Sequence, residues 1–399
     1  MSTRPIKVVV AGAGIGGLAA AIALRQQGCE VVVVEQAAEL GEVGAGVQMS
    51  PNAVKVLRAL AVEPLVRETA CEPLAFTGRD WKSGRVLYRT PIKGTFERLY
   101  GAHYYHVHRA DLHHALCERL GDAELRVGQR VLGVEQHGEV ASLKLADGSA
   151  VEADVVIGAD GIHSAVRRSI VGDDKPRFTG NICWRGMVPV AALPKGHVEL
   201  ASSNWLGPKG HVVHYYVRGG AMVNFVAVYE TDEWKEESWS TPSSVDELLQ
   251  TYSGWNEELL RTFRATERCF KWALYDRDPL PHWSEGRVTL LGDAAHPMLP
   301  FLAQGAAMAI EDGYELATTL GKLRDGVGVE AALIAYEQRR IPRTSRVQLG
   351  ARARGTTMHL RSPWARMKRN LGFMLRSFRK PETTTHRAEW IYGYDATQA

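Results

Sequence analysis

The stretch from residue 7 to residue 34 constrains the fold more than any other part of the chain. It contains an apolar β-branched run, a helix-compatible run and a second β-branched run, with Gly12, Gly14 and Gly17 spaced as G-x-G-x-x-G after the first. Glycine at these positions permits a tight turn and lets the backbone approach a pyrophosphate at a helix N-terminus. Glu35 ends the second run, where a carboxylate accepts hydrogen bonds from an adenosine ribose and disfavours a 2′-phosphate. The stretch therefore predicts a βαβ unit of a parallel sheet that binds FAD or NAD rather than NADP, with a purely structural glycine turn as the alternative.

The rest of the chain is divided around this unit. At 399 residues it exceeds the usual size of one hydrophobic core. Residues 1–178 are predicted to form the first part of a Rossmann-like α/β domain. Residues 179–275 are rich in strand-like aromatic and β-branched runs, which predicts an inserted antiparallel sheet that lines a substrate pocket, with a smaller part from 75–105. Residues 276–345 are predicted to return to the nucleotide-binding domain, and 346–399 to form a C-terminal helical region.

Composition and charge exclude several classes of protein. The formal net charge of +3 gives no reason to expect a nucleic-acid partner, and the five scattered cysteines show neither a disulfide framework nor a zinc spacing. The apolar run near the N-terminus is too short for a membrane span, so we expect a cytoplasmic protein. Residues 351–380 carry Arg and Lys without any acid. This stretch is interpreted as a solvated helical region, with contact to an anionic membrane or a partner as the alternative. The oligomeric state stays open.

A second segment, "GADGIHSAVR", follows another predicted strand. Asp160 stands at the end of that strand, while Ser164 and Arg167 lie on successive turns of the helix that is expected next. The carboxylate of Asp160 can cap this helix and can also face a second ligand group. A plain helix N-cap is the structural alternative.

A third segment, "LLGDAAHPMLPFLAQGAAMAIED", has a composition unusual for the late part of a chain. Its strand-like run stops at Asp293, whose carboxylate could bind ribityl hydroxyl groups in the middle of an FAD. His296 and Pro297 predict a rigid bend. The helix that begins near Gly305 offers free N–H groups to an electron-rich part of the flavin ring. A strand, turn and helix with small residues for packing is the alternative.

The three segments occur in the order and spacing seen in single-component flavoprotein aromatic hydroxylases, and the chain resembles that family over nearly its whole length. The resemblance is greatest to the branch of 3-hydroxybenzoate 6-hydroxylase, salicylate hydroxylase and 6-hydroxynicotinate 3-monooxygenase, in "ELGEVGAGVQMSPNA", "HRADLHHAL" and "EWIYGYD". It implies a p-hydroxybenzoate-hydroxylase-like fold and a transiently docked NADH or NADPH that shares the Asp160 segment with FAD. It also implies that FAD is bound by Gly12, Gly14, Gly17, Glu35, Arg109 and Asp293.

The resemblance implies an NAD(P)H- and O2-dependent monooxygenase that hydroxylates a hydroxylated aromatic acid of the salicylate or 3-hydroxybenzoate type. Triplet O2 does not react readily with a closed-shell ring, so reduced flavin must first form a C4a-hydroperoxide, which survives only in a dry pocket. The ring reacts best as a phenolate, so the pocket needs a base. The alternatives are a hydroxylase of an N-heterocyclic acid of the 6-hydroxynicotinate type, a flavin halogenase or reductase of the same fold, and a non-catalytic flavin-binding sensor.

Candidate pocket residues come from the strand "GHVVHYYVRGG". Its period of two puts His211 and Tyr215 on one face, where an imidazole and a phenol can meet a ring-sized ligand. The resemblance makes this the active face, with His211 as the base, while core aromatic residues of a sheet are the alternative. By resemblance Tyr104 lines the same pocket. Gln48 and Phe301 stand where the hydroxynicotinate enzyme carries histidines, which makes this pocket less polar and argues against an N-heterocyclic substrate.

Other polar side chains are ambiguous. Pro300 stands where the 3-hydroxybenzoate enzyme has a glutamine, so that substrate also fits incompletely. Arg185 and Arg218 are candidates to bind a substrate carboxylate, with solvated cations as the alternative. The spacing of three histidines is not that of a metal site, and flavin chemistry needs no metal; they are His103, His106 and His108.

Overall fold

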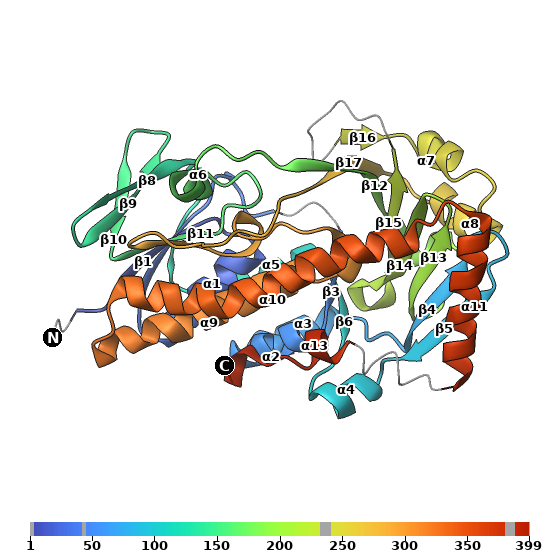
Figure 1. Ribbon diagram of the computed structural model, residues 1–399, viewed down its shortest axis with the longest axis horizontal. Helices are drawn as coiled ribbons and strands as arrows, with labels where there is room; N and C mark the ends of the chain where they lie inside the picture. The colour runs from blue at the N-terminus through green and yellow to red at the C-terminus, as the bar shows by residue number, and fades with distance from the viewer. Residues whose placement is uncertain (1–3, 42–44, 232–240, 380–387, 399) are drawn as a thin grey trace.

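The computed structural model describes residues 4–41, 45–231, 241–379 and 388–398. The masked gaps include three residues of the "ELGEVGAGVQMSPNA" stretch, 42–44, and residue 380 at the end of the basic stretch, so those parts of the expectations lie outside the described residues. The described chain forms two large sheets at opposite ends of an elongated molecule, with helices between and around them (Figure 1).

The first sheet is parallel and contains the glycine motif at one of its edges. Its strand order is β18-β11-β1-β2-β7, and every neighbouring pair is parallel. The carboxyl ends of parallel strands meet at one edge, so the residues that follow β2, β11 and β18 converge there. The strands are β1 Lys7–Ala11, β2 Glu30–Val34, β7 Glu124–Arg126, β11 Val155–Gly158 and β18 Val288–Leu290.

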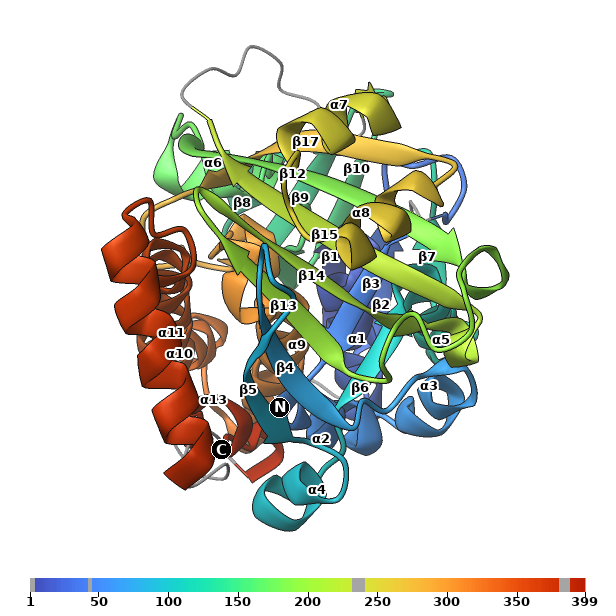
Figure 2. The ribbon, with the colours of Figure 1, turned by 90° about the vertical axis from the view of Figure 1, so that its right-hand side faces the viewer.

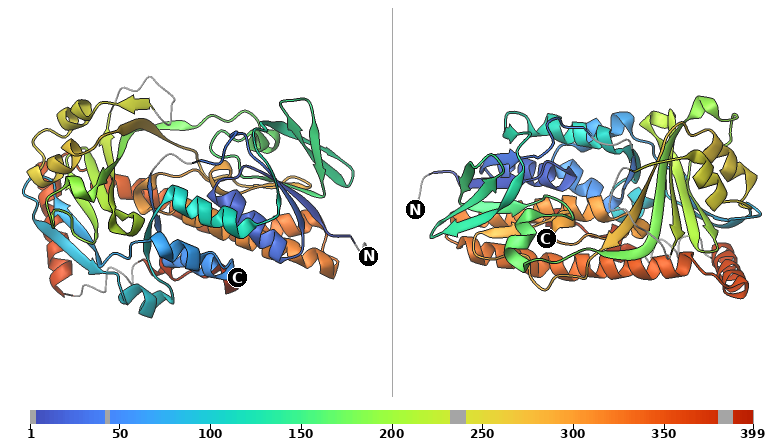
Figure 3. Two further views of the ribbon diagram at one scale, coloured as in Figure 1. Left: turned by 180° about the vertical axis from the view of Figure 1, so that it is seen from behind. Right: turned by 90° about the horizontal axis from the view of Figure 1, so that it is seen from above.

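Long helices cover this sheet. α1 (Ile15–Gln26) packs against α9 (Gly305–Gly321) so closely that a Cβ on Gly313 would lie 2.7 Å from the backbone nitrogen of Ala20. α10 (Val329–Met358) runs alongside α9 and continues to the second sheet, so one helix links both ends of the molecule (Figures 1 and 3).

Smaller elements complete this half. An antiparallel sheet of three strands, β10-β9-β8, follows the first sheet, and β3 pairs with β6 in a two-stranded ribbon. The strands are β3 Gly46–Met49, β6 Tyr105–His108, β8 Val131–His137, β9 Val140–Leu145 and β10 Ala150–Ala153. The helices are α2 Pro51–Ala59, α3 Glu63–Thr69, α4 Thr95–Tyr100, α5 Arg109–Leu120 and α6 Ala165–Val171.

The second sheet has eight strands in the order β16-β17-β12-β15-β14-β13-β4-β5 (Figure 2). All neighbours are antiparallel except β13 and β4, so the sheet is mixed at the point where the early strands join it. The predicted α/β class with an antiparallel second sheet is confirmed, apart from this one parallel pair. The strands are β4 Ala75–Asp80, β5 Val86–Pro91, β12 Arg177–Pro189, β13 Ser202–Gly207, β14 Gly210–Val217, β15 Met222–Glu230, β16 Thr241–Ser243 and β17 Cys269–Asp276.

The two faces of the second sheet differ in their neighbours. Trp184, Trp205 and Val212 point to the outer face, where α7 (Val245–Thr251) and α8 (Glu257–Arg264) cover them in an apolar core. The alternate residues of the same strands point to the inner face, toward β3, β6 and α10. An enclosed wall therefore faces the nucleotide-binding half.

Helices α11 (Pro363–Arg379) and α13 (Glu389–Tyr392) end the described chain, as expected for its C-terminal region. α11 packs on β5 through Phe373 and Met374, next to Tyr88. The opposite side of α11 leaves a line of large apolar side chains exposed: Trp364, Met367, Leu371 and Leu375. Within the described ranges, no helix is long and apolar enough to cross a membrane.

Candidate functional site

The three glycines of the motif have different surroundings. A Cβ on Gly12 would lie 2.4 Å from the carbonyl oxygen of Ala159, and one on Gly17 would lie 2.0 Å from that of Gly12. Gly12 also adopts a φ of +105°. A Cβ on Gly14, in contrast, would meet no atom within 4 Å. Gly12 and Gly17 are thus required by packing, while Gly14 leaves room for a ligand directly before the N-terminus of α1, which suits a pyrophosphate.

Glu35 connects the end of β2 to the glycine loop. Its Oε2 accepts a hydrogen bond from the backbone N–H of Ala13, and its Oε1 accepts one from that of Ala37, both at 2.8 Å. Each carboxylate oxygen has a second lone pair. Glu35 is therefore held in place and can still accept hydrogen bonds from ribose hydroxyl groups.

Asp293 and Arg109 come together from distant parts of the chain. Asp293 is accessible to solvent, yet the protein surrounds it so densely that burial raises the pKa of its carboxyl, against the opposing effects of His296 and Arg109. Arg109 begins α5, and its backbone N–H donates to the carbonyl of Ala45 at 2.8 Å. One carboxylate and one guanidinium thus lie near each other, which suits the ribityl and phosphate groups of FAD.

A buried ion cluster supports the loop that carries Asp293. Oδ2 of Asp312 accepts a hydrogen bond from the backbone N–H of Gly292 at 3.0 Å and lies 2.5 Å from Nε2 of His296. Nε of Arg340 donates to Oδ1 of Asp312 at 2.7 Å. Burial opposes ionisation of Asp312, but His296 and Arg340 outweigh it and lower its pKa to about 2. The bend after His296 is fixed as well, because Nε2 of Gln348 donates to the carbonyl of Pro297 at 3.0 Å.

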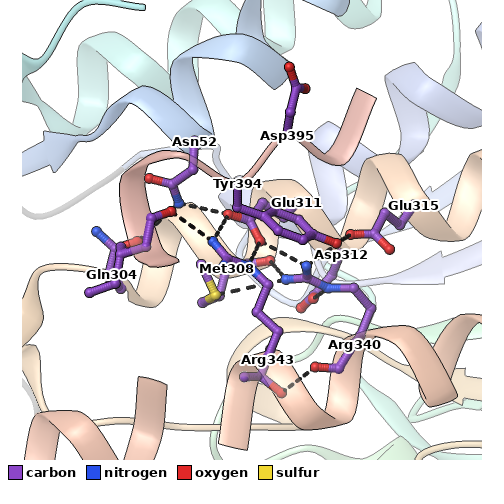
Figure 4. A network of polar contacts seen from close by, with 12 residues as sticks. Asn52, Gln304, Met308, Glu311, Asp312, Glu315, Arg340, Arg343, Tyr394 and Asp395 are labelled. Carbon is purple, nitrogen blue, oxygen red and sulfur yellow. Dashed lines mark hydrogen bonds and ion pairs between the residues drawn. The ribbon is translucent and has the colours of Figure 1, made fainter. Parts of the chain in front are cut away.

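The cluster extends to the start of α9 (Figure 4). Asn52 donates to Oε1 of Gln304 at 3.0 Å and to Oε1 of Glu311 at 2.7 Å, so the side chain of Gln304 is held away from the helix end. A Cβ on Gly305 would have no neighbour closer than 3.9 Å. The N-terminus of α9 is therefore open, as a site next to an electron-rich ring edge requires.

The carboxylate of Asp160 caps the N-terminus of the helix that follows it, α6. This carboxylate accepts hydrogen bonds from the hydroxyl of Ser164, from the N–H of Ala165 at 2.7 Å and from the N–H of Val166 at 3.3 Å. Burial raises the pKa of this carboxyl. These contacts favour the capping alternative, and a role toward FAD or the nicotinamide stays a prediction.

His211 lies on the inner face of the second sheet, in β14. Its Nδ1 is 2.7 Å from Nε2 of His359, at the end of α10, and its ring centre is 5.3 Å from that of Phe301. Burial, His359 and Arg354 lower the pKa of His211 well below its usual value. The imidazole is therefore neutral at physiological pH and has one unprotonated ring nitrogen.

Tyr215 lies four residues further along β14 on the same face, beside Gln48 and Tyr104. The hydroxyl of Tyr104 donates to Oε1 of Gln48 at 2.5 Å, and the ring centres of Tyr215 and His106 are 4.3 Å apart. A glycine is required at position 46, because a Cβ added there would lie 2.7 Å from the ring of Tyr215. The structure thus brings the five predicted pocket residues to one wall: Gln48, Tyr104, His211, Tyr215 and Phe301.

Further polar groups lie on this wall, and two of them, Asn204 and Asn224, were not predicted from the sequence. Register pairs Asn224 with Tyr215, and Val226, two residues further along β15, pairs with both Arg185 and Val213, which places all of them on the inner face. Besides Oδ1 of Asn181 further along β12, four buried polar atoms around this wall have no hydrogen-bond partner among the described residues, and such atoms mark places where a polar ligand or water binds. They are Nε of Arg185, Oδ1 of Asn204, Nδ2 of Asn224 and Nε2 of His106.

Arg185 differs from the solvated cation considered as an alternative. Its guanidinium stacks over Trp272 at 4.5 Å, and burial lowers its pKa. No carboxylate among the described residues forms an ion pair with it, whereas Arg218 lies 3.7 Å from Asp111. The alternation of residues in β12 is the sequence signal that could have placed Arg185 on the inner face.

The histidines near β6 do not form a metal site. His103 is bound by Glu72 at 2.9 Å, and among the described residues no group of His, Cys, Asp or Glu could hold a metal ion.

Together, the dinucleotide cradle and the enclosed wall that faces it define the architecture of a flavoprotein aromatic hydroxylase. A family model described as FAD binding domain matches residues 5–350. A salicylate hydroxylase solved as a substrate complex superposes with a TM-score of 0.83 and 29% identity, covering 100% of this chain and 97% of the other.

Curated relatives match over similar lengths. A 3-amino-4-hydroxybenzoate 2-monooxygenase of Streptomyces platensis is 40% identical over 99% of this chain and 97% of its own length. A 6-hydroxynicotinate 3-monooxygenase of Pseudomonas fluorescens is 39% identical over 87% and 90%, and 3-hydroxybenzoate 6-hydroxylase 1 of Aquipseudomonas alcaligenes is 36% identical over 98% of both. The chain belongs to the FAD-binding domain family, among the aromatic monooxygenases, and FAD is its cofactor. The predicted family, fold class and enzyme class are confirmed.

Proposed function

We propose that the protein is an NAD(P)H- and O2-dependent hydroxylase of a hydroxylated benzoic acid. The observation that carries this proposal is the half-buried guanidinium of Arg185, whose Nε is fully buried. This guanidinium has no acidic partner among the described residues and lies on the inner wall of the second sheet. A cation that is partly removed from water without a counter-charge is unfavourable, and a substrate carboxylate would compensate it. Asn224 offers a further donor beside Tyr215.

The residues of the wall have different roles toward such a substrate. Bound FAD supplies the reducing equivalents taken from NAD(P)H and the activation of O2. The neutral imidazole of His211 accepts the proton of the substrate's hydroxyl group, which makes the ring electron-rich. Gln48, Tyr104 and Tyr215 orient the ring, and the apolar side chain of Phe301 excludes water from one side of it.

A 6-hydroxynicotinate-type reaction is the second candidate, since a relative with that name is 39% identical over 87% of this chain. Gln48 and Phe301 make the pocket less polar than such a substrate favours. The relatives named for 3-amino-4-hydroxybenzoate match 99% of the chain, so this benzoic acid is the first to test.

A panel of ligands with and without a carboxylate tests the proposal. 3-Amino-4-hydroxybenzoate, 3-hydroxybenzoate, salicylate and 6-hydroxynicotinate would be compared by NADH consumption and by the mass of the product, each beside its carboxamide. The wild type should prefer at least one benzoic acid over its amide by about 10²-fold in kcat/KM, and Arg185→Met should remove that preference. Arg218→Met, in which the lost cation already has an acidic partner, is the matched control. Equal use of acids and amides by the wild type would refute an acid substrate.

A further inference from the structure

The base His211 is linked to a histidine from outside the second sheet. His359 follows α10, and its Nε2 lies 2.7 Å from Nδ1 of His211. Both residues are 3% exposed. Two imidazoles in direct hydrogen-bond contact can pass a proton, because each ring can accept at one nitrogen while it donates at the other.

The far side of His359 meets an acid. Its Nδ1 lies 3.5 Å from Oε1 of Glu230, at the end of β15. Nε of Arg361 donates to the other carboxylate oxygen at 2.9 Å. Glu230 is half-buried, and its hydrogen bond with His359 lowers the pKa of its carboxyl. An ionised acceptor therefore stands behind the pair of histidines.

Glu230 and His359 line a cavity of about 500 Å³ behind Phe301. At its edge, the side chains of Arg361 and Arg177 are 60% and 59% exposed, so water reaches the cavity. Phe301 stands between this cavity and His211, with its ring 5.5 Å from that of His359. The imidazoles of His211 and His359 thus connect the enclosed wall to the water-accessible cavity.

We propose that His359 and Glu230 carry the proton that His211 takes from the substrate out to this cavity, an inference that rests on the proposed function of His211. The substrate's O–H bond breaks and its proton binds Nε2 of His211. The proton on Nδ1 of His211 moves to Nε2 of His359, and the proton on Nδ1 of His359 moves to Glu230 or to water. One proton enters and one leaves, so neither ring keeps a charge and no electrons are transferred.

Burial and a nearby positive charge explain why His211 must pass its proton on. Burial and the nearby cation of Arg354 disfavour an imidazolium at His211, while Glu230 and Arg361 are the charged groups at the outer end. The reverse transfer protonates the product and restores both tautomers.

Proton release on ligand binding tests the relay without turnover. Oxidised, FAD-loaded enzyme would be mixed with 3-amino-4-hydroxybenzoate or 3-hydroxybenzoate in weak buffer, with a pH indicator and the phenolate absorbance recorded by stopped flow. His359→Gln keeps a hydrogen bond to His211 but cannot pass a proton through a ring, so release should slow by about 10²-fold. Glu230→Gln is the second variant, and Thr356→Val, which lines the same cavity, should match the wild type.

Chemical rescue separates transfer from support. In His359→Ala, free imidazole can enter through the cavity and should restore fast proton release. If His359 had only a structural role, added imidazole would not restore the rate. Release at the wild-type rate in both His359→Gln and Glu230→Gln would overturn the relay alone. Normal release in His211→Gln, or none in the wild type, would instead overturn the role of His211 as the base and the relay with it.

Discussion

The glycines of one motif make different contributions, which separates cofactor binding from folding. Gly14 faces open space, so Gly14→Ala should leave the unfolding free energy of the apoprotein nearly unchanged and weaken FAD binding by about 10-fold or more, since its methyl group enters the cradle. Gly17→Ala should destabilise the apoprotein by about 1–3 kcal/mol, because its Cβ would overlap the backbone of Gly12. FAD titration and urea denaturation check both, with Gly328→Ala, also in open space, as the control. Equal effects of Gly14→Ala and Gly17→Ala would contradict this division.

At the same scale, local rules predicted part of the candidate site, and the family resemblance added Gln48, Tyr104 and Phe301. The motif spacing identified Gly12 and Glu35, and the period of two along one strand placed His211 beside Tyr215. His359 could not be found this way, because its contact depends on how the end of α10 packs against a sheet strand 148 positions away. The burial of Arg185 likewise depends on the register between three strands.

Helices α9 and α10 are held together by charges rather than by apolar contacts alone. Arg340 is fully buried and binds Glu311, Asp312 and Glu315 at 2.7 to 2.9 Å (Figure 4). Arg340→Met would leave three buried carboxylates short of a counter-charge and should lower the unfolding free energy by about 3–5 kcal/mol. Arg346→Met, the same substitution at an exposed position of α10, should cost less than about 1 kcal/mol. Urea denaturation measures both, and a similar loss in the two variants would show that the cluster adds nothing specific.

Element boundaries followed from sequence patterns where side chains have a clear periodicity. The helix expected from Gly305 onward and the strand before Gly12 lie where the sequence predicts them. The parallel pairing of β13 with β4 could not be predicted, because pairing between distant strands leaves no local signal. The exposed apolar line of α11 could not be predicted from the sequence either, since the same residues could have faced a core.

For the molecule as a whole, the buried cluster sets how stability depends on pH. The folded protein lowers the pKa of Asp312 to about 2, below the value of about 3.9 in an unfolded chain. A carboxyl with a depressed pKa stabilises the fold above its unfolded pKa, and this contribution, about 2 kcal/mol, is lost as the pH falls from about 4 toward 2. Glu311 shifts in the same direction. Urea denaturation between pH 3 and pH 7 should therefore show a steep loss below pH 4.

A matched pair of variants assigns that loss. Asp312→Asn should lower stability at pH 7 and flatten the dependence at acid pH, whereas Asp325→Asn, at an exposed position after α9, should reproduce the wild-type curve. An unchanged slope in Asp312→Asn would remove this carboxyl from the explanation.

β18 and α9 are synthesised late in the chain, which affects how the protein folds during translation. β11 acquires its second neighbour only when residues 288–290 have been synthesised, and α1 remains uncovered until 305–321 follow. A nascent polypeptide therefore has an unpaired strand edge and an exposed apolar helix while strands β12 to β17 of the second sheet are translated. Fragments that end before residue 321 should aggregate or bind chaperones, and none of them should yield a soluble yellow product.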